Sequence, residues 1–192
     1  VAFTLVFLIY SNYFKRFIFQ RCLPGFLMCK DKRELILVRH AQAESISYSG
    51  LDFDRSLTSL GEEQARLMAR RAMSFDLKID QLICSPAIRA KMTALAFCRE
   101  INYQPREILY LERLYEGTLQ DYLKVFSTLA ENTIIIFGHN PGIQDFGNWL
   151  CGGYFQNFPP AGVMCARTTL DQIANMAKGR GELIRFEYPD ML

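Results

Sequence analysis

The sequence predicts an α/β protein, a three-layer α/β/α sandwich in which helices cover both faces of a mostly parallel sheet. Short runs of β-branched and large apolar residues occur along the chain, and such runs are typical of buried strands. They alternate with segments whose apolar residues recur at helical spacing, which favours parallel strands joined by helices. The length of 192 residues suits one domain with an adequate core.

The first predicted elements are a strand, a loop and a helix. The apolar run over residues 34–39 predicts a buried strand. Residues 41–57 are polar and rich in serine, which is typical of a loop. Apolar side chains recur on one helical face over residues 60–75. Ser59 with Glu62 matches a capping box, so we expect Ser59 to be the N-cap of this helix.

The second and third strands are predicted over residues 80–84 and 107–111, with a helix between them. Ser85 followed by Pro86 has the pattern of an N-cap and a proline at the first helical position. This pattern predicts that the helix begins directly after the second strand.

The fourth strand is predicted over residues 133–138, between two further helices. Thr118 is the expected N-cap of the helix before it. Asn140 and Pro141 repeat the pattern of N-cap and first-turn proline after the strand. The two glycines at 152–153 predict the end of that helix.

The last part of the chain alternates between apolar and polar residues in two segments. This alternation predicts strands over residues 162–170 and 182–188. A helical turn is expected over the intervening residues 171–178. These two strands complete the predicted sheet.

The first 30 residues differ from the rest of the chain. They carry four basic residues and no acidic one, and their apolar run is shorter than the ~20 residues that span a bilayer. We expect residues 1–30 to be an extension outside a catalytic domain over residues 31–192. That domain holds 18 basic and 20 acidic side chains, a net charge of −2 against +2 for the whole chain. A near-neutral domain argues against nucleic acid as a partner, and no membrane partner is expected for it.

The cysteines give no sign of a metal site. No two of the six form a CxxC pair or a spacing typical of a zinc finger, and the chain has only two histidines. Cys84 and Cys98 lie in apolar stretches, where cysteine usually serves as a small buried side chain. A reducing, cytoplasmic location suits this pattern, and we expect no bound metal. The six positions are Cys22, Cys29, Cys84, Cys98, Cys151 and Cys165.

Each of the two histidines follows directly after a predicted strand. His40 ends the first apolar run and His139 ends the fourth. In open α/β sheets, ligands bind at the carboxyl ends of the strands. We therefore expect the two imidazoles, although about a hundred residues apart in the sequence, to lie in one pocket. Arg39 precedes the first histidine, Arg89 lies one helical turn beyond the second strand, and Glu112 lies at the end of the third.

Two arginines, two histidines and one carboxylate suit a dianionic phosphoryl group. The planar fork of arginine binds two phosphate oxygens at once, and helix starts add backbone N–H groups. A neutral imidazole is a competent nucleophile toward phosphorus, and a carboxylic acid can protonate the leaving group. Because arginine and protonated histidine supply positive charge, the chemistry requires no metal and no other cofactor.

These residues lie in motifs that resemble the histidine phosphatase superfamily, also called the phosphoglycerate-mutase-like fold. Residues 37–41 are similar to its Arg-His-Gly signature, with Ala41 in place of the usual glycine. Residues 84–93 are similar to its second-arginine motif, and residues 138–142 to its second-histidine motif. The branch that the chain resembles most is the SixA-like phosphohistidine phosphatases, from about Glu34 to the C-terminus.

The resemblance implies a role for each residue. His40 is expected to be the nucleophile, and Glu112 the general acid, with Glu116 as the alternative. Arg55 is a further candidate for binding phosphate, although it could instead brace its own loop. The other residues expected to bind phosphate are Arg39, Arg89 and His139. Of these, Arg39 and His139 are also expected to be catalytic.

The expected function is hydrolysis of a phosphoryl group through a covalent phosphohistidine intermediate. A protein that carries phosphohistidine is the preferred substrate, because short loops predict an open pocket, and a small phosphorylated metabolite is the next choice. A non-catalytic phosphate-recognition module would keep the arginines but need no nucleophile. A mutase would need a closed pocket that excludes water. We expect a monomer or a weak oligomer.

Overall fold

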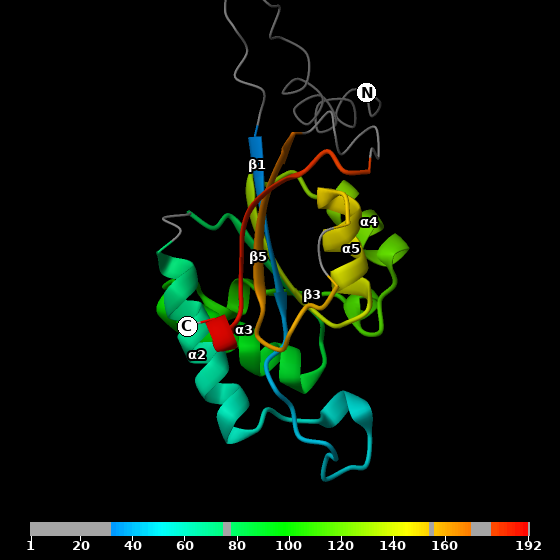
Figure 1. Cartoon of the computed structure of the whole chain (residues 1–192). Coiled ribbons are helices and arrows are strands. Elements are labelled where there is room, and N and C mark those ends of the chain that lie inside the picture. The colour runs from blue at the N-terminus through cyan, green and yellow to red at the C-terminus, as the bar shows by residue number, and fades with distance from the viewer. Residues whose placement is uncertain (1–31, 75–77, 154–155, 170–177, 192) are drawn as a thin grey trace, which may run out of the picture.

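A mixed six-stranded sheet lies between two helical layers in the computed structural model of this chain (Figure 1). The structure describes residues 32–74, 78–153, 156–169 and 178–191. The expected extension over residues 1–30 and nearly all of the expected helical turn over residues 171–178 lie outside these ranges.

The strand order across the sheet is β3-β2-β4-β1-β5-β6. The first four of these strands run parallel, as predicted. Strand β5 runs antiparallel to both of its neighbours, since Val163 at its start pairs with Val38 near the end of β1 and with Glu187 at the end of β6. The strands are β1 (Lys32–Arg39), β2 (Gln81–Cys84), β3 (Leu109–Tyr110), β4 (Thr133–Gly138), β5 (Val163–Thr169) and β6 (Glu182–Glu187).

In the described residues, four helices form the outer layers, with α2 and α3 on one face of the sheet and α4 and α5 on the other (Figure 1). The predicted three-layer sandwich is therefore confirmed. The helices are α2 (Ser59–Met73), α3 (Ile88–Glu100), α4 (Leu119–Ser127) and α5 (Gly142–Cys151). Short 3-10 turns are η1 (Asp52–Asp54), η2 (Pro105–Glu107), η3 (Glu112–Leu114) and η4 (Pro189–Met191).

The central strands are apolar throughout because both of their faces are covered. In β1, Ile36 and Val38 pack with the core under α2 and α3. Leu35 and Leu37 alternate with them and pack with the core under α4 and α5. Successive side chains of a strand point to opposite faces, so a strand buried on both sides shows no polar alternation.

Three predicted helix starts are wrong by one or two residues. The N-cap of α2 is Thr58 and not Ser59, because Thr58 keeps an extended backbone and its hydroxyl accepts the Gly61 N–H at 2.9 Å. Helix α3 begins only at Ile88, and helix α5 begins at Gly142, both without a side-chain cap.

The reason for the two later starts is that tertiary contacts hold the predicted cap residues. The Ser85 hydroxyl bonds His139 at 2.8 Å. The Asn140 side-chain amide donates to the Phe158 carbonyl at 3.1 Å and to Gln144 at 3.2 Å. These contacts orient both side chains, and neither forms a capping bond to the helix that follows it.

Two further predicted helix boundaries are confirmed. Thr118 caps α4 in a capping box with Asp121, and Gly152 ends α5 in the left-handed conformation. Every cysteine within the described ranges is free and buried. None of the helices in the described ranges is long and apolar enough to cross a bilayer.

Gly138, the last residue of β4, has no room for a side chain, because a Cβ there would overlap the hydroxyl of the fully buried Tyr122. We predict that Gly138→Ala lowers the free energy of unfolding by about 1–3 kcal/mol through overpacking. Adding Tyr122→Phe removes the most crowded atom, so the double variant should lose less than the two single variants together. Urea denaturation of all four proteins measures this coupling, and strictly additive losses would contradict the overlap.

Candidate active site

The register between β1 and β4 places the two histidines side by side. Arg39 pairs with Gly138 at the carboxyl ends of these parallel strands, and a histidine follows on each. The His40 backbone N–H continues the ladder by donating to the Gly138 carbonyl at 3.1 Å. The two imidazole centroids lie 5.0 Å apart, with the rings tilted by 54°. The structure thus brings together the pair that the sequence singled out.

The hydrogen bond of His40 determines which of its nitrogens carries the proton. Its Nδ1 lies 2.7 Å from the carbonyl oxygen of Ala41, which can only accept, so Nδ1 carries the hydrogen. Burial, together with the charges of Arg89 and Arg39, lowers the pKa of His40 to about 4. The ring is therefore neutral at pH 7, and Nε2 keeps its lone pair.

His139 is also a neutral, buried imidazole. Burial, followed by the proximity of His40 and Arg89, lowers the pKa of His139 to about 3. Its Nε2 lies 2.8 Å from the Ser85 hydroxyl, which follows β2 on the other side of β4. Its Nδ1 is buried and has no hydrogen-bond partner among the described residues.

Two predicted phosphate-binding arginines lie beside these rings, and the charge of each acts on both histidines. The Arg39 Nη1 donates to the Phe158 carbonyl at 2.7 Å, which ties the end of β1 to the turn before β5. Arg89 lies in the first turn of α3 and is only 5% exposed. The long side chains are thus fixed before any ligand binds.

Asp52 was not predicted as a site residue, yet it organises this cluster. Its backbone carbonyl and carboxylate accept hydrogen bonds from Arg89 at 2.6 and 2.8 Å. The carboxylate oxygen that accepts from Arg89 is Oδ2, and it also accepts a hydrogen bond from the Tyr115 hydroxyl at 3.0 Å. The other oxygen, Oδ1, lies 3.0 Å from the Arg55 Nε. Although desolvation opposes it, the bond to Arg89 lowers the pKa of Asp52. The sequence signal was its position three residues before Arg55, within one helical turn.

The segment after β3 reaches the site through Tyr115. Its ring meets the His139 ring edge-on, with centroids 5.9 Å apart, and the Arg89 guanidinium lies 6.0 Å from its centre. Glu112 and Glu116 flank this tyrosine and are exposed. Within the described part of the chain, neither glutamate side chain makes a hydrogen bond or ion pair. The structure therefore places Tyr115, and not a glutamate, against His139.

Three buried nitrogen atoms of the candidate site residues have no hydrogen-bond partner in the described structure, namely Arg39 Nε, Arg89 Nε and His139 Nδ1. A buried polar group without a partner costs about 1–3 kcal/mol, and the oxygens of a bound oxyanion would satisfy such donors. Across the described ranges, no group of three histidine, cysteine, aspartate or glutamate side chains is placed to hold a metal ion. The arrangement suits a tetrahedral anion next to His40.

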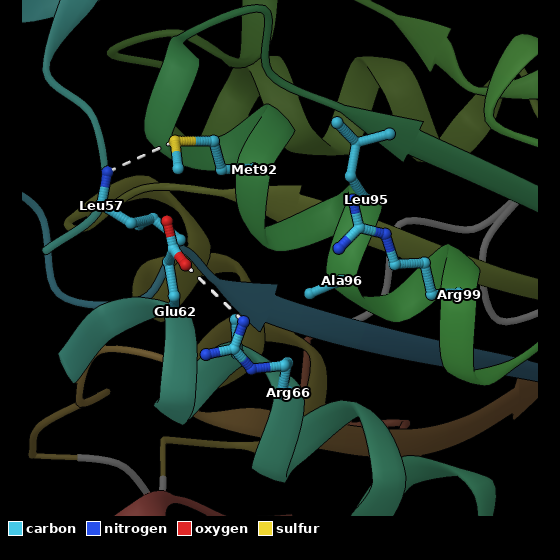
Figure 2. Close-up of a pocket in the computed structure, with 8 residues that line it drawn as sticks. Leu57, Glu62, Arg66, Met92, Leu95, Ala96 and Arg99 are labelled. Carbon is cyan, nitrogen blue, oxygen red and sulfur yellow. Dashed lines mark hydrogen bonds and ion pairs between the residues drawn. The ribbon is translucent and has the colours of Figure 1, made fainter. Parts of the chain in front are cut away.

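A separate cleft of about 230 Å³ lies between α2 and α3 (Figure 2). Leu57, Met92 and Leu95 contribute apolar walls, and the Glu62–Arg66 ion pair spans 3.6 Å at its edge. None of the candidate phosphate-binding residues lines this cleft. We therefore assign the chemistry to the carboxyl ends of the strands and not to this cleft.

Comparison with known proteins identifies the family of this chain. Residues 35–135 match the model of the histidine phosphatase superfamily, branch 1, a range that includes His40, Arg55, Arg89 and Glu112. An uncharacterized protein of Picosynechococcus is 27% identical over 70% of this chain and 85% of its own length. The mitochondrial serine/threonine-protein phosphatase Pgam5 of Drosophila persimilis is 33% identical over 46% of this chain and 30% of its own length.

Solved structures share the whole fold. The SixA structure from Agrobacterium tumefaciens is 25% identical and covers 82% of this chain and 98% of its own, with a TM-score of 0.71. A SixA structure with bound tungstate is 19% identical and covers 82% of this chain and 98% of its own, with a TM-score of 0.69. It shows that the fold is shared. Together with the family match over more than half of the sequence, these findings show that the chain belongs to branch 1 of the histidine phosphatase superfamily and is SixA-like.

Proposed function

We propose that this chain is a metal-independent phosphatase that hydrolyses phosphohistidine on proteins through a covalent intermediate on His40. The observation that carries the proposal is the bond from His40 Nδ1 to the Ala41 carbonyl, because it leaves the Nε2 lone pair free as a nucleophile. This atom belongs to a ring 5.0 Å from that of His139, within the field of Arg39 and Arg89.

In the first step, His40 Nε2 attacks phosphorus, a nitrogen–phosphorus bond forms, and the bond from phosphorus to the leaving group breaks. Arg39, Arg89 and His139 hold the phosphoryl oxygens, whose charge the fixed donors stabilise. A proton passes to the leaving group from Glu112, or from Glu116. In the second step, water attacks phosphorus, gives its proton to the same carboxylate and releases neutral His40 with phosphate.

Two features favour phosphohistidine over a phosphoester. An imidazole leaving group needs less help from an acid than an alkoxide does, and both glutamates lie exposed and unpaired within the described structure. The tungstate-bound SixA structure is named a protein histidine phosphatase. The Pgam5 relatives are named serine/threonine-protein phosphatases, a name that supports a protein substrate but points to a phosphoester and not to phosphohistidine. The buried free thiols of the described ranges fit the reducing cytoplasm that we propose as its location.

Substitution of His40 by alanine should lower turnover by about 10³-fold or more, because its Nε2 is the atom that attacks phosphorus in the proposed mechanism. Rapid quenching with a radiolabelled phosphohistidine protein should trap acid-labile phosphate on the wild-type enzyme and none on His40→Ala. The His139→Ala variant is the matched control and should still take label, only more slowly. Tight binding of substrate without any label on the wild-type chain would instead indicate a phosphate-recognition module.

The two histidines should titrate far below the usual pH. Because the chain has only two, isotope-labelled histidine gives two sets of imidazole signals, which His40→Ala and His139→Ala assign. We expect His40 to titrate near pH 4 and His139 near pH 3, compared with 6.5 for a free ring. Since the neutral ring of His40 is the nucleophile, activity should be lost as the pH falls through about 4. A signal of the ligand-free enzyme that titrates above pH 6 would contradict this.

Stability should follow the same shifts. The unfolded chain binds protons on its histidines below about pH 6.5, whereas folded His40 does not until about pH 4. The free energy of unfolding should therefore fall as the pH is lowered across this interval. His40→Ala together with His139→Ala should flatten that part of the profile in urea denaturation at fixed ionic strength. An equal slope in the double variant would mean that other groups cause it.

The general acid can be identified with two leaving groups. Glu112→Gln should slow hydrolysis of a small phosphomonoester strongly, and of protein phosphohistidine only slightly, because the ester oxygen depends on the proton. Glu116→Gln is the matched control four residues along the same segment. Equal losses on both substrates for Glu112→Gln would argue against its role as acid, and the reverse ranking of the two variants would assign that role to Glu116.

A further inference from the structure

Ser85 lies at the junction between β2 and α3 and is fully buried. Its Oγ lies 2.8 Å from His139 Nε2, and the Ala87 N–H reaches the same oxygen at 3.4 Å. Its own backbone N–H donates to the Phe137 carbonyl, which fixes it beside the strand that carries His139. Capping does not explain this residue, because α3 begins at Ile88 without a side-chain cap.

The surroundings of Ser85 determine which partner donates in its bond to His139. The Ala87 N–H can only donate, so it uses a lone pair of the hydroxyl oxygen. If His139 also donated, the hydroxyl proton would have no acceptor among the described residues, in a place without solvent. A buried donor without an acceptor is unfavourable, so the hydroxyl proton goes to His139 Nε2.

We propose that Ser85 is a positioning residue that fixes the tautomer of His139 and directs its Nδ1–H at the phosphoryl group. This inference rests on the proposed function and deepens it, since it concerns the same site. With Nε2 accepting from Ser85, the single ring proton of a neutral imidazole must reside on Nδ1. That atom is buried and has no partner in the described structure, so a phosphoryl oxygen can accept its hydrogen.

The two histidines then have the same tautomer, with the proton on Nδ1, but each leaves a different ring nitrogen free for the ligand. In His40 the Nδ1–H is held by the Ala41 carbonyl, and the free atom is a lone pair that attacks phosphorus. In His139 the lone pair is held by Ser85, and the free atom is an N–H that binds oxygen. Without Ser85, His139 could place its proton on Nε2 and turn a lone pair toward the phosphoryl oxygens, which would repel them.

The direct test is nitrogen NMR of the ligand-free enzyme labelled at histidine. His139 should show a protonated Nδ1 and an unprotonated Nε2 at pH 7 in the wild-type chain. In Ser85→Ala the two shifts should move toward each other as the tautomers mix, whereas the His40 shifts should stay unchanged. A wild-type His139 that is protonated on Nε2, or on both nitrogens, overturns the proposal without the need for any variant.

Kinetics give the second readout. Ser85→Ala should lower kcat by about 10- to 100-fold, less than the loss expected when a phosphate-binding donor itself is removed. Ser85→Cys keeps a weak donor and should recover part of this loss, and Ser127→Ala, on the exposed side of α4, should keep full activity. If Ser85→Ala folds and keeps both the wild-type shifts and kcat, the proposal is wrong. Phosphate trapped on His40 in these variants shows independently whether the proposed function holds.

Discussion

The parallel pairing of β1 with β4 is the constraint on which the site depends. Hydrogen bonds of the ladder place Arg39 opposite Gly138, and the next residue on each strand is a histidine. The pairing of β2 with β4 adds Ser85 at the same edge, because Cys84 lies opposite Phe137. Three residues far apart in the sequence therefore converge because their backbones share one register. A slip of one residue would turn one imidazole to the other face of the sheet.

Burial then determines the chemical state of these groups. Removing the imidazoles from water disfavours their charged forms, and the neighbouring guanidinium groups add repulsion. The arginines keep their charge, and Asp52 is their internal counter-ion through contacts to Arg89 and Arg55. In the mechanism that we propose, a phosphoryl dianion competes with Asp52 for Arg89, since both would bond to the same guanidinium. The site thus combines neutral nitrogen atoms with permanent positive charge, as transfer of a phosphoryl group requires.

The side of the site formed by residues 111–116 is less constrained than the strand ends. Tyr115 contacts His139 and Asp52, whereas the glutamates on either side of it are exposed. In the mechanism that we propose, the nucleophile and the phosphate-binding donors lie at the strand ends and in the first turn of α3, whereas the acid has an exposed side chain. This arrangement suits a leaving group that departs without much protonation. This contrast is the physical basis for ranking phosphohistidine above phosphoesters.

The sequence by itself determined the three layers, the strands and the position of both histidines at strand ends. These features depend on local apolar patterns and on motifs of adjacent residues. It also indicated Arg39 and Arg89, which lie within those motifs. Only the tertiary structure decided the contacts of Asp52, Tyr115 and Ser85, because each bonds to a residue distant in the sequence. The predicted caps at Ser85 and Asn140 were wrong for the same reason. Local sequence gives the side chains that can close a helix, but a stronger contact across the fold decides whether they do.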